Sequence, residues 1–112
     1  MALDLTTEHS GDIAVITLSG ELDAGSAGSF RDAVEQIATE SPKRVVLVMD
    51  QLKFMASAGL RVLVFAKQKM GTGVDLFVVG AHDAVLETIE MTGFHHIVIM
   101  MDAFDRSAIE NY

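Results

Sequence analysis

The most constraining feature of the sequence is an unbroken apolar run at its centre, residues 45–49 of RVVLVM. A strand that is apolar at every position is buried on both faces, as strands are in a parallel sheet covered by helices. The run therefore predicts a central strand of an α/β fold.

The flanking patterns supply the other elements. Alternating β-branched residues predict strands at 3–7 and 13–18, joined by a turn at Ser10-Gly11-Asp12. Apolar residues at helical spacing predict a helix over 26–40, with Ser26 as its N-cap and Pro42 beyond its end. The same signals predict a helix at 57–70, a strand at 74–79, a helix at 81–91, a strand at 97–101 and a last helix after Asp102.

Helices that alternate with apolar strands imply right-handed crossovers and a mainly parallel sheet. We therefore expect one α/β domain over residues 1–112, with a mixed, mostly parallel central sheet flanked by about four helices.

The composition excludes several classes of function. A formal charge of -8 and a pI near 4.7 oppose binding to nucleic acid or to an anionic membrane surface. The chain has no cysteine, no apolar stretch of membrane-spanning length and no secretory signal at its start. We expect a soluble, cytoplasmic protein without disulfides.

The junction after the central run is the predicted functional site, because ligands of open α/β folds bind at the carboxyl ends of strands. The run ends at Asp50, a short loop follows, and Ser57 opens the next helix. Gly59 is expected to let another backbone approach closely. Met55, Ala56 and Ala58 surround the Ser57 hydroxyl, which predicts an exposed apolar docking patch.

Two other interpretations of Ser57 remain open at this point. Serine is a common N-cap, so the hydroxyl can serve the helix alone. It can also resemble a hydrolase nucleophile followed by Gly59, but the position of the leading glycine holds Met55 and the chain is short for such an enzyme. We expect that this protein is not an enzyme.

Cofactor sites are not predicted. His95 and His96 are adjacent, so on a strand they would face opposite sides, and neither has a second ligand at the i+4 spacing of helical zinc sites. No phosphate-binding loop sequence is present, and residues 71–73 (GTG) are interpreted as a helix-ending turn.

Four segments together resemble the STAS family, in particular the small bacterial anti-sigma factor antagonists. They are GELDA at 20–24, Phe30-Arg31, FMASAGL at 54–60 and EMTGF at 90–94, and the similarity spans residues 13–104. The resemblance implies a STAS domain that binds an anti-sigma factor serine kinase and so releases a sigma factor.

The resemblance also implies the switch and its site. The family's phosphorylated serine corresponds to Ser57; phosphorylation dissociates the complex, and a PP2C-type phosphatase resets it. Ala56 and Ala58 replace the family's aspartate and second serine, which leaves Ser57 as the serine of this loop. The implied partner-binding residues are Leu22, Asp23, Ala24, Ser26, Met55, Ala56, Ser57, Ala58, Gly59, Leu60 and Arg61. The alternative is a STAS module that senses a small ligand or nucleotide, or a signalling scaffold, with Ser57 as a helix cap.

Overall fold

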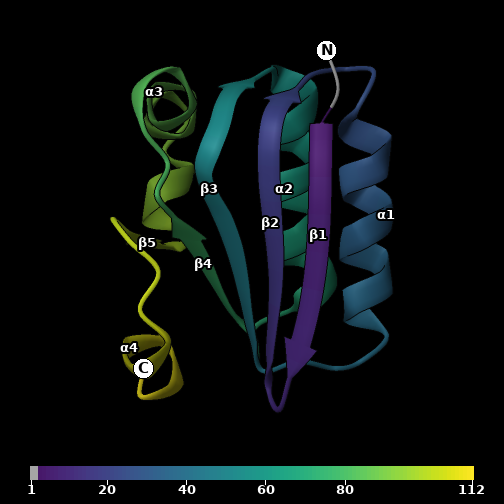
Figure 1. Ribbon diagram of the computed structural model, residues 1–112, viewed down its shortest axis with the longest axis vertical. Helices are drawn as coiled ribbons and strands as arrows, with labels where there is room; N and C mark the ends of the chain where they lie inside the picture. Colours follow the sequence, from purple (N-terminus) through teal and green to yellow (C-terminus); the bar gives the residue numbers. More distant parts are fainter. Residues whose placement is uncertain (1–2) are drawn as a thin grey trace.

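A five-stranded mixed sheet organises the computed structural model, which describes residues 3–112 (Figure 1). Its strands lie in the order β1-β2-β3-β4-β5, with β1 antiparallel to β2 and every other pair parallel. The strands are β1 (Leu3–Ser10), β2 (Ile13–Leu22), β3 (Arg44–Met55), β4 (Asp75–Val79) and β5 (Ile99–Met101). This arrangement confirms the predicted α/β fold with a mostly parallel sheet.

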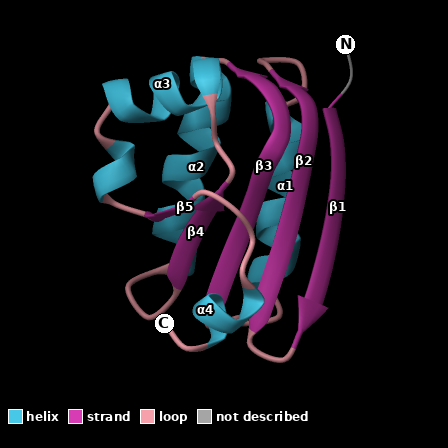
Figure 2. Cartoon of the chain, turned by 60° about the vertical axis from the view of Figure 1, so that its left-hand side comes forward, coloured by secondary structure: helices cyan, strands magenta, loops and turns pink. Residues whose placement is uncertain are grey.

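The helices cover the two faces of the sheet unequally. Helices α1 (Ala27–Ala38), α2 (Ser57–Met70) and α3 (Asp83–Met91) pack on one face, and α4 (Arg106–Glu110) lies on the other (Figure 2). The main core lies under α1, α2 and α3. The smaller core under α4 contains Ile13, Val15, Val46, Phe77, Val79 and Ile109.

The β1–β2 hairpin is confirmed where the turn residues placed it. Ser10 pairs with Ile13 across a two-residue turn. Gly11 has φ +61°, which a glycine adopts without strain.

Strand β3 is longer than predicted. It does not end at Met49 but continues to Met55, so the expected loop after Asp50 is wrong. Pairing with β4 stops at Val48, whereas pairing with β2 continues through two register shifts. The apolar run ends at residue 49, close to the point where β4 stops pairing with β3. The end of the run therefore marks the loss of a neighbouring strand and not the end of β3.

The helical spacing of Leu60, Leu63 and Val64 predicts that these residues of α2 are buried. Leu63 is buried, but Val64 is 41% exposed and Leu60 is only half-buried. Val62 and Ala66 complete the buried face instead.

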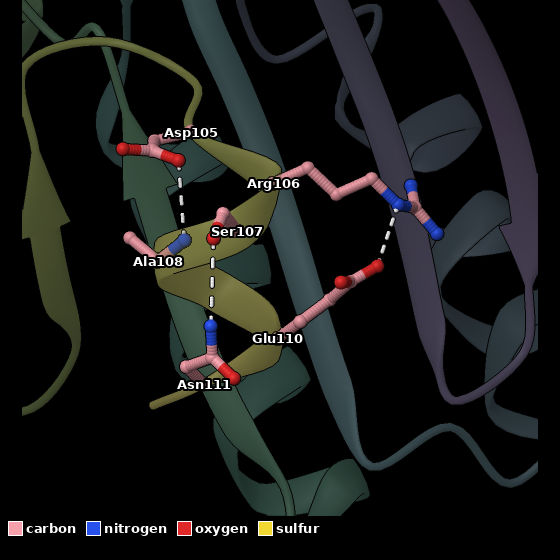
Figure 3. Close-up of polar contacts among 6 residues, drawn as sticks. All are labelled: Asp105, Arg106, Ser107, Ala108, Glu110 and Asn111. Atoms are coloured by element: carbon pink, nitrogen blue, oxygen red, sulfur yellow. Dashed lines mark hydrogen bonds and ion pairs between the residues drawn. The ribbon is translucent and has the colours of Figure 1, made fainter.

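The C-terminal region differs from the prediction in two places. Residues 94–96 form a 3-10 helix, so β5 is limited to Ile99–Met101. Asp105, not Asp102, caps α4, because its Oδ1 accepts a hydrogen bond from the Ala108 N–H at 3.1 Å (Figure 3). Only Ile109 of this helix is buried.

Candidate functional site

The candidate site lies where β2 and β3 end side by side. Leu22 pairs with Met55 at the last register position, and the Ala56 N–H donates to the Leu22 carbonyl at 2.8 Å. Because the two strands are parallel, their carboxyl ends bring the loop before α1 and the start of α2 to the same edge of the sheet (Figure 1). The structure thus brings together the two predicted segments, 22–26 and 55–61.

Ser57 is the first residue of α2 and not its N-cap. Ala56 occupies the cap position with extended backbone angles, and its carbonyl accepts from the N–H groups of Gly59 (2.9 Å) and Leu60 (3.2 Å). Ser57 is exposed, and within residues 3–112 its hydroxyl has no hydrogen-bond partner. The alternative interpretation of Ser57 as a helix cap is wrong, and its hydroxyl is free for other chemistry.

Gly59 is required by side-chain packing. A Cβ at this position would lie 2.6 Å from both Cγ and Cδ2 of Leu22 and 3.2 Å from Cγ of Met55. Leu22 is fully buried. Gly59 therefore lets α2 approach the buried Leu22 side chain, and not another backbone as predicted.

The exposed apolar surface differs from the predicted patch. Met55 is only 3% exposed and contributes to the core, while Ala56, Ala58 and Leu60 are half-buried. The preceding residue, Phe54, is 44% exposed and supplies the apolar surface instead.

One stripe of α2 extends the site from Ser57 along the helix. Ser57, Arg61 and Val64 follow each other at helical spacing and are all exposed. The sequence does not indicate that Phe54 and Val64 are exposed, because each is next to a buried apolar residue, Met55 or Leu63. We define the switch surface as Ser57, Arg61 and Val64 with the loop 22–26.

The loop 22–26 is closed by Asp23 and Ser26. The Asp23 N–H donates to Ser26 Oγ, and both the N–H and the hydroxyl of Ser26 donate to Asp23 Oδ1, each at 3.0 Å. Ser26 occupies the N-cap position of α1 as predicted, but its side chain makes no capping hydrogen bond to the helix and bonds Asp23 instead. The hydrogen bond from the Ser26 hydroxyl, followed by that from its N–H, lowers the pKa of Asp23 below its ordinary value.

We expect Ser26→Ala to lower the free energy of unfolding at pH 7, because it removes the hydrogen bond from the Ser26 hydroxyl to the Asp23 carboxylate. The folded-state pKa of Asp23 is depressed, so this contribution is present above about pH 4 and is lost as the pH falls through the lower, folded value. Urea unfolding at pH 7 and pH 3 measures it. Ser29→Ala, at an exposed serine of α1, is the matched control, and an equal loss in both variants would refute the role of the loop.

The other sites weighed from the sequence have different surroundings. His95 and His96 lie in the 3-10 helix rather than on a strand, and their ring centroids are 3.9 Å apart. Across the described part of the chain, no three His, Asp, Glu or Cys side chains are grouped to hold a metal ion.

No helix among residues 3–112 is long and apolar enough to span a membrane.

Comparisons with known proteins identify a matching family and related chains. Residues 4–108 match the family described as STAS domain. The anti-sigma-F factor antagonist RsfB of Mycobacterium tuberculosis is 27% identical over 86 residues, which cover 77% of this chain and 70% of RsfB.

Two solved structures share the fold. The crystal structure of an anti-sigma factor antagonist from Mycobacterium paratuberculosis has a TM-score of 0.89 at 23% identity, covering 97% of this chain and 95% of that one. The phosphorylated form of the Bacillus cell fate determinant SpoIIAA has a TM-score of 0.74 at 20% identity and covers 98% of both chains.

Proposed function

Because this chain belongs to the STAS domain family, we propose that it is an anti-sigma factor antagonist switched off by phosphorylation at Ser57. In the unmodified state it binds an anti-sigma factor serine kinase, and the kinase then releases its sigma factor. The relatives named as anti-sigma factor antagonists support this class of regulatory function, and we infer no catalytic activity for the chain.

The observation that carries the proposal is the free hydroxyl of Ser57. It is exposed, it is not used as a helix cap, and it stands at the carboxyl end of the parallel strands. A kinase therefore reaches Ser57 without breaking an internal hydrogen bond. SpoIIAA, which shares this fold, is known in a phosphorylated form.

The switch surface has the composition of a docking site. Val64 offers apolar area, and Arg61 offers a cation between Val64 and Ser57 along α2. Arginine side chains provide much of the binding energy at protein interfaces. We infer that the kinase contacts Arg61, Val64 and the hydrogen-bonded 22–26 loop.

Phosphorylation acts through charge. A phosphate adds about -1.5 to -2 charges at pH 7, and it would stand at the N-terminus of α2, whose first turn holds no acidic residue. Arg61 lies one turn further along the helix, where its guanidinium can pair with the phosphate. Arg61 would then no longer be available to contact the kinase. The same change adds repulsion and a desolvation cost to the apolar interface.

Ala56 and Ala58 affect how a kinase recognises Ser57. With alanine at the cap position and after the serine, Ser57 is the one phosphoacceptor in residues 50–60. We infer that the kinase positions Ser57 through the surrounding surface rather than through an adjacent carboxylate. A PP2C-type phosphatase would restore the unmodified protein, and the cytoplasm is the compartment in which such a switch acts on sigma factors.

Charge reversal tests the surface. We expect Arg61→Glu to weaken binding to a candidate anti-sigma kinase at least about tenfold, or ~1.4 kcal/mol, measured by isothermal titration calorimetry. Arg106→Glu is the matched control, since it makes the same change on α4, at the far end of the molecule (Figure 1). Equal affinities for both variants would place the interface elsewhere.

A further inference from the structure

The turn between β4 and α3 is fastened to β3 at Asp50. Strands β3 and β4 pair only as far as Val48 and Val79, so the next part of β3 has no β4 partner. There His82 Nε2 lies 2.9 Å from the Asp50 carbonyl oxygen. The imidazole therefore takes the place of a hydrogen bond that a longer β4 would have made.

Close packing holds this turn against β3. Gly80 has φ +76°, and a Cβ there would lie 2.8 Å from Cβ of Asp50. The Gly80 N–H donates to the Met101 carbonyl at 2.9 Å. Gly80 thus holds the turn between β3 and β5, independently of the hydrogen bond between His82 and Asp50.

The second ring nitrogen of His82 also meets an acceptor. Nδ1 lies 2.8 Å from Oδ2 of Asp83, a carboxylate. A neutral imidazole has one N–H and one lone pair, so it donates to only one of two acceptors. Hydrogen bonds to both oxygens require the doubly protonated, positively charged ring.

The backbone at Asp83 supports this arrangement. Asp83 has φ +50°, a left-handed conformation that aspartate and asparagine tolerate better than most residues. Asp83 is also the first residue of α3. Its conformation directs the carboxylate to His82 at the point where the helix begins.

The charged groups around the ring are carboxylates. Asp50 and Asp83 face it from β3 and α3. The hydrogen bond with Asp83, and next that with the Asp50 carbonyl, raise the pKa of His82 above its ordinary value.

We propose that His82 is a pH-sensitive positioning residue: its doubly protonated ring latches the start of α3 to Asp50 and holds the part of β3 that leads to Ser57. When the ring loses one proton, the remaining N–H stays on Nδ1, because the Asp83 carboxylate is a stronger acceptor than a carbonyl oxygen. The lone pair of Nε2 then faces the Asp50 carbonyl oxygen, and the latch opens. The proposal rests on the geometry of the turn and is independent of the proposed partner.

The sign of the pH dependence follows from the direction of the shift. A raised folded-state pKa means that the latch is fully formed below the unfolded value of about 6.5 and is lost as the pH rises through the folded value. The segment from Asp50 to Met55 and the start of α3 are therefore expected to loosen in mildly alkaline solution.

Two measurements on the intact chain test the latch. NMR titration of the histidine rings should give His82 a pKa above 6.5, and Asp83→Asn, which keeps a residue suited to the left-handed backbone, should lower it. Amide hydrogen exchange, corrected for the intrinsic rate, should show several-fold less protection of residues 50–55 and 83–86 at pH 8.5 than at pH 6.

His82→Gln should abolish that pH dependence, whereas His96→Gln, at an exposed histidine outside the turn, should retain it. Titration of His82 at or below 6.5, or the same pH-dependent protection in His82→Gln as in the wild type, would overturn the proposal.

Discussion

Gly59→Ala is expected to lower the free energy of unfolding by about 1–3 kcal/mol, the usual cost of overpacking a tightly packed core. The new methyl group would lie 2.6 Å from Cγ and Cδ2 of Leu22, a side chain with no accessible surface. Neither group can move into solvent, so α2 must shift away from β2. Urea unfolding monitored by circular dichroism measures the loss.

Gly28→Ala provides a control of opposite sign. Gly28 lies in α1, and a Cβ there would meet nothing within 4 Å among the described atoms. Alanine at an open helical position stabilises a protein by about 0.4–1 kcal/mol, mainly by restricting the unfolded chain. Similar stability changes for both variants would contradict the packing assigned to Gly59.

Ser57→Glu is expected to weaken binding to the anti-sigma kinase by about 100-fold, or ~2.7 kcal/mol, while leaving the fold intact. A carboxylate at the first position of α2 interacts favourably with the helix dipole, which stabilises the free protein by about 0.3–1 kcal/mol. The same charge within the switch surface opposes burial under a partner. Stability and affinity should therefore change in opposite directions, as calorimetry and thermal unfolding can show.

Two variants separate the charge from the loss of the hydroxyl. Ser57→Ala should retain binding, because Ser57 makes no internal hydrogen bond among residues 3–112. Ser107→Glu adds the same charge to α4, which lies at the opposite end of the molecule from the start of α2 (Figure 1), and should bind as the wild type does. Equal losses for Ser57→Glu and Ser107→Glu would mean that net charge alone, not the position of Ser57, controls binding.

The sequence predicted the arrangement of the sheet well because local pattern and burial agree there. The apolar run at residues 45–49 is central and parallel on both sides, and Gly11 forms the hairpin turn where expected. The positions of the two site loops also follow from the fold, since parallel neighbouring strands end at one edge.

The extent of β3 was not predictable from apolar residues alone. Its last seven residues, 49–55, have no β4 partner, and among them Phe54 is exposed while Leu52 and Met55 are buried. That mixture resembles a loop in sequence. The exposed Phe54 follows from the strand continuing, which only the register with β2 shows.

The role of Ser57 depended on a one-residue offset. Serine is favoured at helix N-caps, but the extended backbone that defines the cap belongs to Ala56. Residue preferences do not resolve one position, and here that position separates a structural hydroxyl from a free one. The contact between His82 and Asp50 joins residues 32 apart, so no local pattern announces it.

Intact-mass analysis of the protein incubated with ATP and its candidate anti-sigma kinase tests whether Ser57 is the phosphorylated residue, with complex formation followed in the same samples. We expect one added phosphate in the wild type, none in Ser57→Ala, and dissociation of the wild-type complex as the phosphate is added. A phosphate that persists in Ser57→Ala, or a phosphorylated protein that still binds the kinase with unchanged affinity, would contradict the assignment of Ser57 as the switch.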